Sequence, residues 1–290
     1  MAYTSRYPIT DNAAEAMSTP TPQTTPVSIN DLRTIGRQLM AAMPTCRSDR
    51  DARRVLQIGA AGDTTHPIDK AAEDIIISSL SALQRPMTII SEELGIMDIN
   101  GGGHRVIIDP IDGSRNAVYG LPFFSTSIAL SSGKTMGQCY MGYIINLISG
   151  EEFYATKGQG AFLNDTRLHA QRSDETEIIL YESREPAREL PRLLGLFSMA
   201  KRLRSLGSTA LDMAYVASGA AAAFVTPSRS RSFDFAAGIV IVREAGGTVT
   251  DIEGNDIDHM EINLERSSTI LAAVNNAVHS NALGAINRES

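Results

Sequence analysis

The segment that most constrains this chain is Val106–Asn116, with the sequence VIIDPIDGSRN. Its first three residues are apolar and β-branched, which predicts a buried strand. The strand ends directly in Asp109 and Asp112, on a turn that Pro110 stiffens and Gly113 frees. Two carboxylates this close repel one another unless a cation lies between them. Oxygen ligands alone favour a hard cation, with Mg²⁺ ahead of Ca²⁺ or Mn²⁺.

The composition is that of an ordinary globular protein. The chain has 290 residues, of which 43% are hydrophobic and 20% are charged, so we expect one large domain or two closely packed ones. No apolar run reaches the roughly 18–20 residues that span a bilayer, and the start does not resemble a secretory signal. A net charge of −7 argues against a nucleic-acid partner. Cys46 and Cys139 lie far apart, which favours reduced thiols in a cytoplasmic protein without a membrane partner.

Turn residues and periodicity divide the chain into an extension and two subdomains. Residues 1–27, rich in Thr, Pro and Ser, carry too little apolar surface to become ordered, so we expect a mobile N-terminal extension. We expect an α+β subdomain with most metal ligands over 28–175, and an α/β subdomain with Asp234 and the substrate contacts over 176–290. Helical spacing predicts helices over 29–44, 67–83, 188–199, 208–218, 235–245 and 276–287. Apolar runs predict strands over 87–90, 106–108, 123–130, 137–148, 178–181, 202–206, 248–251 and 269–274, with a hairpin over 152–163 and an arginine-bearing loop over 226–232.

Further acidic residues stand at the end of a predicted strand or at the start of a predicted helix. Asp69 begins the second helix, Glu92 and Glu93 follow a strand, and Asp234 opens the helix over 235–245. Each of these positions alone has a simpler explanation. An aspartate at a helix start complements the helix dipole and caps free amides, and a glutamate pair often lies in a solvated loop. Together with the two aspartates of the first segment, however, they predict one site built from several carboxylates.

Five separate blocks, in order along the chain, resemble the inositol monophosphatase superfamily of magnesium-dependent, lithium-sensitive phosphatases. The resemblance extends from about residue 60 to 275, and its blocks are Ile90–Glu93, Asp109–Asn116, Gly150–Phe162, Gly207–Asp212 and Phe233–Gly247. Residues Gly62–Lys70 are most similar to archaeal-type enzymes that act on both inositol monophosphates and fructose 1,6-bisphosphate. The resemblance implies an α+β fold, a layered αβαβα sandwich of the sugar-phosphatase type. It also implies a site between the two subdomains and a homodimer, which is the usual oligomeric state in this family.

The resemblance also implies a ligand set for the metal ions. Glu92, Asp109 and the Ile111 carbonyl would hold one Mg²⁺, and Asp109, Asp112 and Asp234 would hold a second. Mn²⁺ is a possible substitute. Two hard cations roughly 3.5–4 Å apart can stabilise both the entering and the leaving oxygen of an in-line displacement. The barrier that such a site must lower is among the highest known for biological reactions.

Other residues of the first segment are implied to act on water and on the phosphate. Asp69 and the Ser114 hydroxyl would form the pair that orients and deprotonates the attacking water. Glu92 or Asp69 would help to place a third, weaker Mg²⁺. The amides of Gly113 and Ser114, at a helix start, would bind phosphate oxygens. No covalent phosphoenzyme is needed, because water is the nucleophile.

Substrate contacts are expected in the second half of the chain. Arg229 and Arg231 fall where archaeal-type relatives carry loop arginines, and a guanidinium suits a second phosphate; the alternative is a solvated basic loop. Ser208 could bind a sugar hydroxyl or simply cap the next helix, and Asp234 is expected to contact the substrate as well as the metal. Pro227 lies where animal-type enzymes place a glutamate that binds the inositol ring, which argues against strict inositol specificity.

Three functions follow, in this order. The first is magnesium-dependent hydrolysis of a polyol or sugar phosphate, with inositol 1-phosphate and fructose 1,6-bisphosphate as the first candidates. The second keeps the site but takes a nucleotide, such as a 3′-phosphorylated adenosine phosphosulfate. The third is a non-catalytic relative that binds metal and a phosphorylated ligand; the complete set of acidic residues with Ser114 argues against it.

Overall fold

The computed structural model describes residues 25–47, 53–169 and 175–288. The mobile extension expected over 1–27 lies outside these ranges except for its last three residues, and the side chain of Cys46 also lies outside them. None of the described helices is long and apolar enough to cross a membrane.

The N-terminal half supplies three α-helices and most strands. Its elements are α1 (Ile29–Arg47), β1 (Gln57–Ile58), β2 (Thr64–Thr65), α2 (Pro67–Ala82), β3 (Met87–Ser91), β4 (Gly95–Ile99), β5 (His104–Asp112), α3 (Ser114–Tyr119), β6 (Ser125–Ser131), η1 (Met136–Gln138), β7 (Cys139–Asn146), β8 (Glu152–Thr156), β9 (Gly160–Leu163) and β10 (Thr166–Arg167). Seven of these strands and β10 form one sheet in the order β10-β9-β8-β7-β6-β5-β3-β4. Strand β5 runs parallel to β3 and antiparallel to β6.

The C-terminal half supplies the remaining helices and a second sheet. Its elements are β11 (Ile178–Tyr181), α4 (Pro186–Glu189), η2 (Leu190–Leu193), α5 (Leu194–Phe197), β12 (Arg202–Arg204), α6 (Thr209–Ala217), β13 (Ala223–Arg231), α7 (Ser232–Glu244), β14 (Thr248–Thr250), β15 (Arg266–Ala273) and α8 (Asn276–Asn287). The sheet order is β12-β11-β13-β15-β14. Strand β11 is parallel to both of its neighbours, whereas β15 is antiparallel to β13 and β14.

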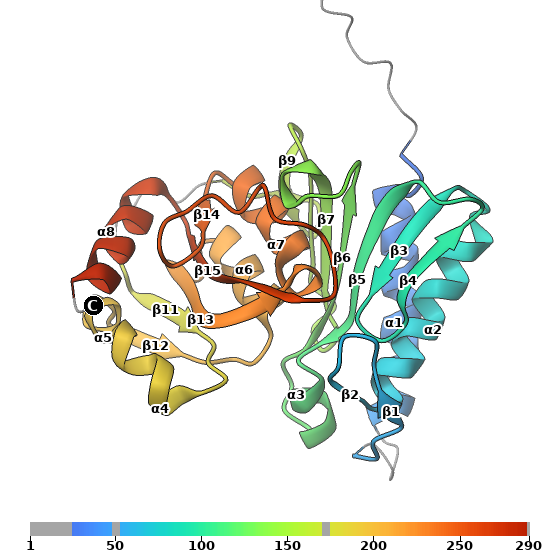
Figure 1. Cartoon of the computed structure of the whole chain (residues 1–290), viewed down its shortest axis with the longest axis horizontal. Coiled ribbons are helices and arrows are strands. Elements are labelled where there is room, and N and C mark those ends of the chain that lie inside the picture. The colour runs from blue at the N-terminus through green and yellow to red at the C-terminus, as the bar shows by residue number, and fades with distance from the viewer. Residues whose placement is uncertain (1–24, 48–52, 170–174, 289–290) are drawn as a thin grey trace, which may run out of the picture.

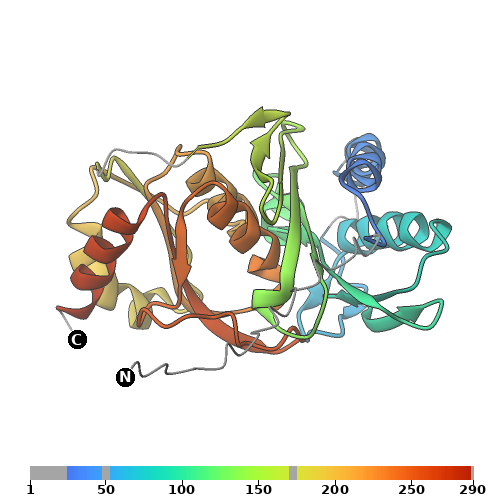
Figure 2. The same ribbon diagram turned by 90° about the horizontal axis from the view of Figure 1, so that it is seen from above.

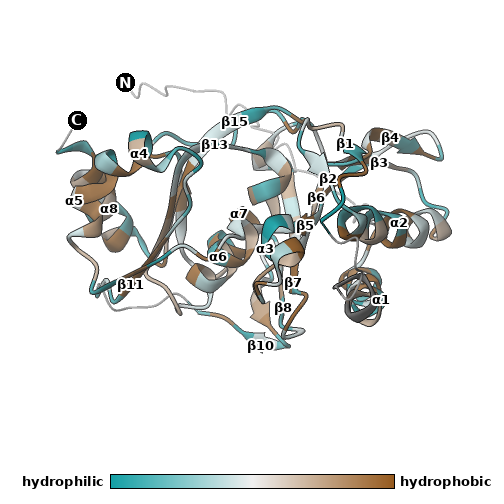
Figure 3. Ribbon diagram, turned by 90° about the horizontal axis from the view of Figure 1, so that it is seen from below, coloured by the Kyte–Doolittle hydropathy of each residue, from teal (hydrophilic) through white to brown (hydrophobic). Residues whose placement is uncertain are grey.

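Helices and sheets alternate in five layers (Figure 1). Helices α1 and α2 cover one face of the large sheet, α6 and α7 lie between the two sheets (Figure 2), and α4, α5 and α8 lie beyond the small sheet. Hydrophobic residues gather on the strands and helices that face one another between the layers, and hydrophilic ones on the outer loops (Figure 3). The predicted αβαβα sandwich is therefore confirmed.

The apolar side chains of strand β5 pack alternately into the hydrophobic cores on its two faces. Successive side chains of a strand point to opposite faces. Val106 and Ile108 pack in the core formed with α1 and α2, while Ile107 between them packs in the core that contains α6 and α7. All three side chains are at most 1% exposed. The unbroken VII run thus reflects a central strand with both faces covered, as the sequence predicted.

Helix α7 is buried on all sides, with ten of its residues in the core. It lies very close to the large sheet, because Gly142 on β7 has no side chain. A Cβ atom at Gly142 would lie 2.5 Å from the carbonyl oxygen of Ala237 on α7. This close packing sets the distance between α7 and the large sheet.

Three sequence-based boundaries were wrong, each for a physical reason. The turn expected after Asp109 is absent, because β5 continues to Asp112 with a register shift against β6. The single helix expected over 188–199 is broken into α4, η2 and α5, since Pro191 has no amide hydrogen to donate. The arginine-bearing loop expected over 226–232 is the end of β13, where Ser230 pairs with Ser268 of β15.

Candidate active site

Five carboxylates from four elements meet at one end of the large sheet. Glu92 follows β3 directly, and Asp109 and Asp112 lie at the end of β5. Because β3 and β5 are parallel neighbours, with Ser91 beside Ile108, the two strands end at the same edge. Asp69 and Asp234 stand in the first turns of α2 and α7. The charges of the other four, Glu92, Asp112, Asp234 and Asp69, all act to raise the pKa of Asp109.

Asp109 lies at the centre of this group. Its side chain is 2% exposed, and its Oδ1 has no hydrogen-bond partner among the described residues. Burial, followed by the negative charges of Glu92, Asp112 and Asp234, holds the pKa of Asp109 well above its ordinary value. The pKa of Glu92 is raised in the same way, by burial and then by Asp234. A divalent cation bound between these carboxylates would relieve such mutual repulsion.

Asp112 is held in place by the second half of the chain. Its Oδ2 accepts hydrogen bonds from Ser208 Oγ at 2.6 Å and from the Ala210 amide at 2.7 Å. Burial raises the pKa of Asp112 to about 7, although these two hydrogen bonds act to lower it. Ser208 is itself buried and accepts a hydrogen bond from the Leu211 amide, so it caps α6. The structure therefore places Ser208 behind Asp112, with its hydroxyl already engaged.

Asp69 and Ser114 lie close to one another. Asp69 Oδ2 accepts a hydrogen bond from the His66 amide at 2.7 Å, whereas its buried Oδ1 has no partner in the described part of the chain. Burial raises the pKa of Asp69, and the hydrogen bond from the His66 amide partly opposes this rise. The Ser114 hydroxyl donates to the Ile111 carbonyl at 2.8 Å. Its proton is thus directed toward Ile111, and its oxygen remains near Asp69.

Gly113 joins β5 to α3 where the two halves of the chain touch. Its φ of 94° lies in the left-handed region, which glycine adopts at little cost. A Cβ atom at Gly113 would lie 2.8 Å from the carbonyl oxygen of Gly207. Asn116 donates from Nδ2 to the carbonyls of Phe123 and Leu206, both at 2.7 Å, and fixes this contact. The backbone at Gly113 therefore contacts the backbone at Gly207 beside the carboxylates. This contact lies at the start of α3, which is predicted to bind phosphate.

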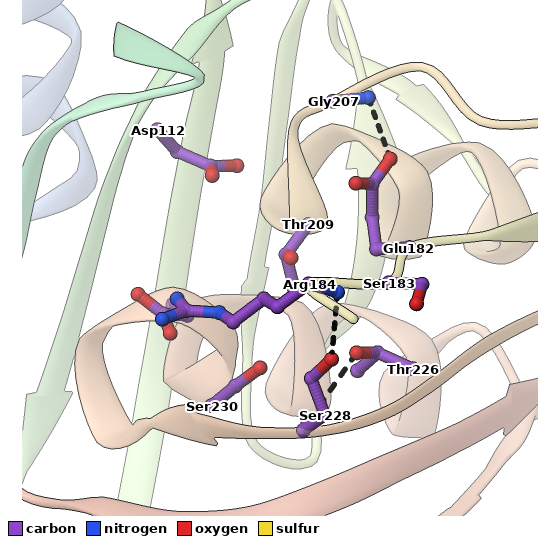
Figure 4. Close-up of a pocket in the computed structure, with 10 residues that line it drawn as sticks. Asp112, Glu182, Ser183, Arg184, Gly207, Thr209, Thr226, Ser228 and Ser230 are labelled. Atoms are coloured by element: carbon purple, nitrogen blue, oxygen red, sulfur yellow. Dashed lines mark hydrogen bonds between the residues drawn. The ribbon is translucent and has the colours of Figure 1, made fainter. Parts of the chain in front are cut away.

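A polar pocket opens beside Asp112 and Asp234 (Figure 4). Its other described lining residues are Glu182, Ser183, Arg184, Gly207, Thr209, Thr226, Ser228 and Ser230. The segment that follows β11, from Glu182 to Arg184, was missed by the sequence reasoning. Its only signal was a charged run, ESRE, directly after a predicted strand. The pocket is lined by hydroxyls and charges, which suits a hydrophilic ligand.

The two arginines predicted to contact substrate lie in different surroundings. Arg229 is exposed and does not line the pocket, whereas its neighbours on β13 do. The Arg231 side chain is 6% exposed and pairs with Asp63 and, at 3.6 Å, with Glu92. It also donates to the Ala61 carbonyl. Arg231 therefore ties the loop between β1 and β2 to the carboxylates, a role that the sequence did not reveal.

Asp63 is the residue of this loop that pairs with Arg231. It accepts hydrogen bonds from both Arg231 and Arg266. Burial acts to raise the pKa of Asp63, but the hydrogen bond and charge of Arg231, with Arg266, hold it below its ordinary value. The loop from Gly59 to Asp63 is thus fixed over the site by charges from the C-terminal half.

The donor set fits a hard divalent cation. All candidate ligands are oxygens, and the buried Oδ1 atoms of Asp69 and Asp109 lack partners among the described residues. No three His, Cys, Asp or Glu side chains in the described ranges form a complete metal-binding group. The carboxylates are near enough to repel one another, and Arg231 places a positive charge 3.6 Å from Glu92.

A model of the inositol monophosphatase family matches residues 25–287. The chain belongs to this family. A fructose-1,6-bisphosphatase/inositol-1-monophosphatase of Methanothermobacter thermautotrophicus is 34% identical over 261 residues, which cover 84% of this chain and 91% of the relative. A bifunctional NADP phosphatase/NAD kinase of Methanococcus maripaludis is 30% identical, over 79% of this chain and 44% of the relative. Among solved structures, the extragenic suppressor protein SuhB of Bartonella henselae has a TM-score of 0.76 and 31% identity, covering 89% of this chain and 98% of its own.

The resemblance predicted from the five sequence blocks is thereby confirmed. Membership of the inositol monophosphatase family makes the protein a phosphoric monoester hydrolase. Enzymes of this family depend on metal ions.

Proposed function

We propose that this member of the inositol monophosphatase family hydrolyses the phosphomonoester of a polyol or sugar, with Mg²⁺ as the metal. Inositol 1-phosphate and fructose 1,6-bisphosphate are the first substrates to test. The observation that carries the proposal is Asp109, a buried carboxylate with an unpartnered oxygen beside the negative charges of Glu92, Asp112 and Asp234. A cation site is the arrangement that makes this grouping favourable.

The ligands would be those predicted from the sequence. Glu92, Asp109 and the Ile111 carbonyl would hold one ion, and Asp109, Asp112 and Asp234 a second. A third ion beside Glu92 or Asp69, and replacement of Mg²⁺ by Mn²⁺, belong to the same proposal. When bound, these ions would neutralise phosphate charge and make water a stronger acid. Ser208 and the Ala210 amide keep one oxygen of Asp112 fixed, which presents the other oxygen to the site.

Asp69 would accept the proton of the attacking water. One of its oxygens is held by the His66 amide, while the other is buried and free of partners in the described structure. The free oxygen can therefore take a proton without giving up an existing hydrogen bond. The oxygen of Ser114, which donates to Ile111, retains lone pairs that can accept a hydrogen bond from the water. The Gly113 and Ser114 amides, at the start of α3, would bind the phosphate oxygens.

The test is phosphate release from a panel of phosphomonoesters with Mg²⁺ and with EDTA. Wild type should release phosphate only with the metal, and Asp112→Asn should lose at least 100-fold in kcat. Asp74→Asn is the matched control, because Asp74 is an exposed aspartate on α2 whose partner is Lys70. Equal release by wild type and Asp112→Asn would show that this carboxylate does not serve the reaction.

A second candidate substrate is a nucleotide that carries a phosphomonoester. The similarity to an archaeal NADP phosphatase favours it. NADP and 3′-phosphoadenosine 5′-phosphate therefore belong on the same panel, and a kcat/KM at least ten times higher on either would select this alternative. Metal binding without turnover of any substrate would select a non-catalytic role.

Four further properties remain predictions. They are inhibition by Li⁺, a homodimer, a cytoplasmic location and contacts from Arg229, Arg231 and Ser208 to the substrate. Li⁺ titration of the Mg²⁺-dependent activity and light scattering of the purified protein test the first two.

A further inference from the structure

Arg184 carries the positive charge of the polar pocket. It follows β11 and extends its side chain across the pocket, between Thr209 and Ser230 (Figure 4). The other charged residues among the described lining are acidic: Asp112, Glu182 and Asp234. An arginine in this place either neutralises those acids or binds an anion that enters the pocket.

The backbone of Arg184 is firmly anchored. Its amide donates to Ser228 Oγ at 3.0 Å and to Glu189 Oε2 at 3.1 Å. The same Glu189 oxygen accepts from Ser183 Oγ at 2.6 Å and from Ser228 Oγ at 2.7 Å. One carboxylate of α4 thus fixes the base of the Arg184 side chain against β13.

The guanidinium of Arg184, by contrast, makes no hydrogen bond or ion pair with any described residue. Its five N–H donors are available in a partly desolvated pocket. The two nearby arginines are already engaged, because both Arg231 and Arg266 pair with Asp63. Asp234 is near enough to attract Arg184 electrostatically, but no contact between them falls within ion-pair distance. Of these three arginines, Arg184 is therefore the one whose guanidinium has no hydrogen bond or ion pair with a described residue.

Arg184 and the carboxylates of β5 enter the site from different sheets. The phosphate to be cleaved belongs beside Asp109 and Asp112, at the end of the large sheet. Arg184 reaches the pocket from the small sheet, together with hydroxyls of β13. Planar guanidinium donors match phosphate oxygens in pairs. The hydroxyls of Thr209 and Ser230, which face the same space in Figure 4, suit the hydroxyl groups of a sugar.

We propose that Arg184 binds a second phosphate of the substrate, so that the enzyme favours sugar bisphosphates over monophosphates that lack this group. The inference rests on the proposed function and adds to it the class of substrate and the residue that selects it. Arg184 contacts the phosphate that is not cleaved, and its loss weakens binding more than it slows the chemical step.

The test compares two substrates in two variants. Arg184→Gln should raise the KM for fructose 1,6-bisphosphate about 10–100-fold, because charged hydrogen bonds to the second phosphate are lost. The KM for inositol 1-phosphate, and kcat for both, should stay within about threefold. Arg184→Lys keeps the charge without the paired donors and should give an intermediate KM for the bisphosphate. Arg188→Gln is the control, since Arg188 is four residues away and its side chain is 81% exposed.

Several outcomes would overturn the proposal. An equal rise in KM for both substrates would mean that Arg184 acts on the reacting phosphate or on Asp234. No change in KM for either substrate would mean that the pocket does not bind an anion through Arg184. If Arg184→Gln melts at a lower temperature than wild type, Arg184→Lys decides: an equal loss on both substrates overturns the proposal, and a selective loss on the bisphosphate supports it. A wild type inactive on the whole panel of phosphomonoesters refutes the proposed function itself, which separates that failure from this one.

Discussion

Asp112→Asn should stabilise the metal-free protein while it removes activity. In the folded state the pKa of Asp112 rises from 3.8 to about 7, so the fold favours the protonated form. Ionisation of this carboxylate therefore destabilises the fold progressively between about pH 4 and pH 7. A rise of about three units, at 1.36 kcal/mol for each, corresponds to about 4 kcal/mol once the pH exceeds 7. An amide keeps the shape of the side chain and an acceptor for Ser208 and Ala210, and it carries no charge.

The assay is thermal unfolding of wild type and Asp112→Asn in EDTA across pH. At pH 8 the variant should melt roughly 8 °C above wild type, since 1 kcal/mol corresponds to about 2 °C in a chain of this size. The difference should fall to about 2 °C at pH 4.5, where the folded wild-type carboxylate is protonated but the unfolded one, with a pKa of 3.8, is still largely ionised. Saturating Mg²⁺ should raise the Tm of wild type more than that of the variant, because ligand binding stabilises only a folded protein that keeps its ligands.

The control for this experiment is Asp74→Asn. It removes one negative charge from the exposed ion pair with Lys70 on α2, and exposed pairs contribute at most about 1 kcal/mol. Its Tm should therefore follow wild type at both pH values. A metal-free Asp112→Asn protein that melts at or below wild type at pH 8 would refute the reasoning, because the carboxylate would then not destabilise the fold.

Three further predictions concern other parts of the molecule. Ser208→Ala removes the 2.6 Å hydrogen bond to Asp112 and the cap of α6; urea unfolding should show a loss of about 1 kcal/mol, and kcat should fall while the KM stays near wild type. An unchanged kcat would mean that Ser208 acts only as a helix cap. Gly142→Ala places a Cβ atom 2.5 Å from the backbone of α7 and should cost about 1–3 kcal/mol by the same measurement, whereas a neutral result would mean that the helix can move away. Burial raises the pKa of Cys139 to about 12, so in a Cys46→Ser background this thiol should resist iodoacetamide at pH 8 until the protein unfolds; rapid labelling of the native protein would contradict its burial.

The parts of the site that the sequence predicted are those encoded locally. The strand that ends in Asp109 and Asp112 could be recognised because a buried strand is an unbroken apolar run, and the following glycine marks the start of a helix. Asp69 could be placed at a helix start because Pro67 precedes it. That these residues form one site could be predicted only from the resemblance to a family, because no local pattern shows which strand ends are neighbours.

The parts that the sequence did not reveal depend on distant pairing. Arg231 and Asp63 are 168 residues apart in the chain, yet they form one ion pair over the site. Arg231 was assigned to a loop because β13 is recognisable as a long strand only through its partner β15. Arg184 was missed because a charged run after a strand is typical of any surface turn, and only the pocket gives it a role.

The position of β13 in the small sheet limits how early the active site can fold during synthesis. Strand β13 leads directly into α7 and Asp234, and it is held between β11 and β15. On the ribosome, all five carboxylates have been synthesised by residue 234, but β13 still lacks its partner on one side until Arg266–Ala273 has emerged. Pairings between distant segments form late. A nascent chain that ends soon after α7 thus contains every carboxylate of the site, yet it lacks the strand that would hold the last of them in position.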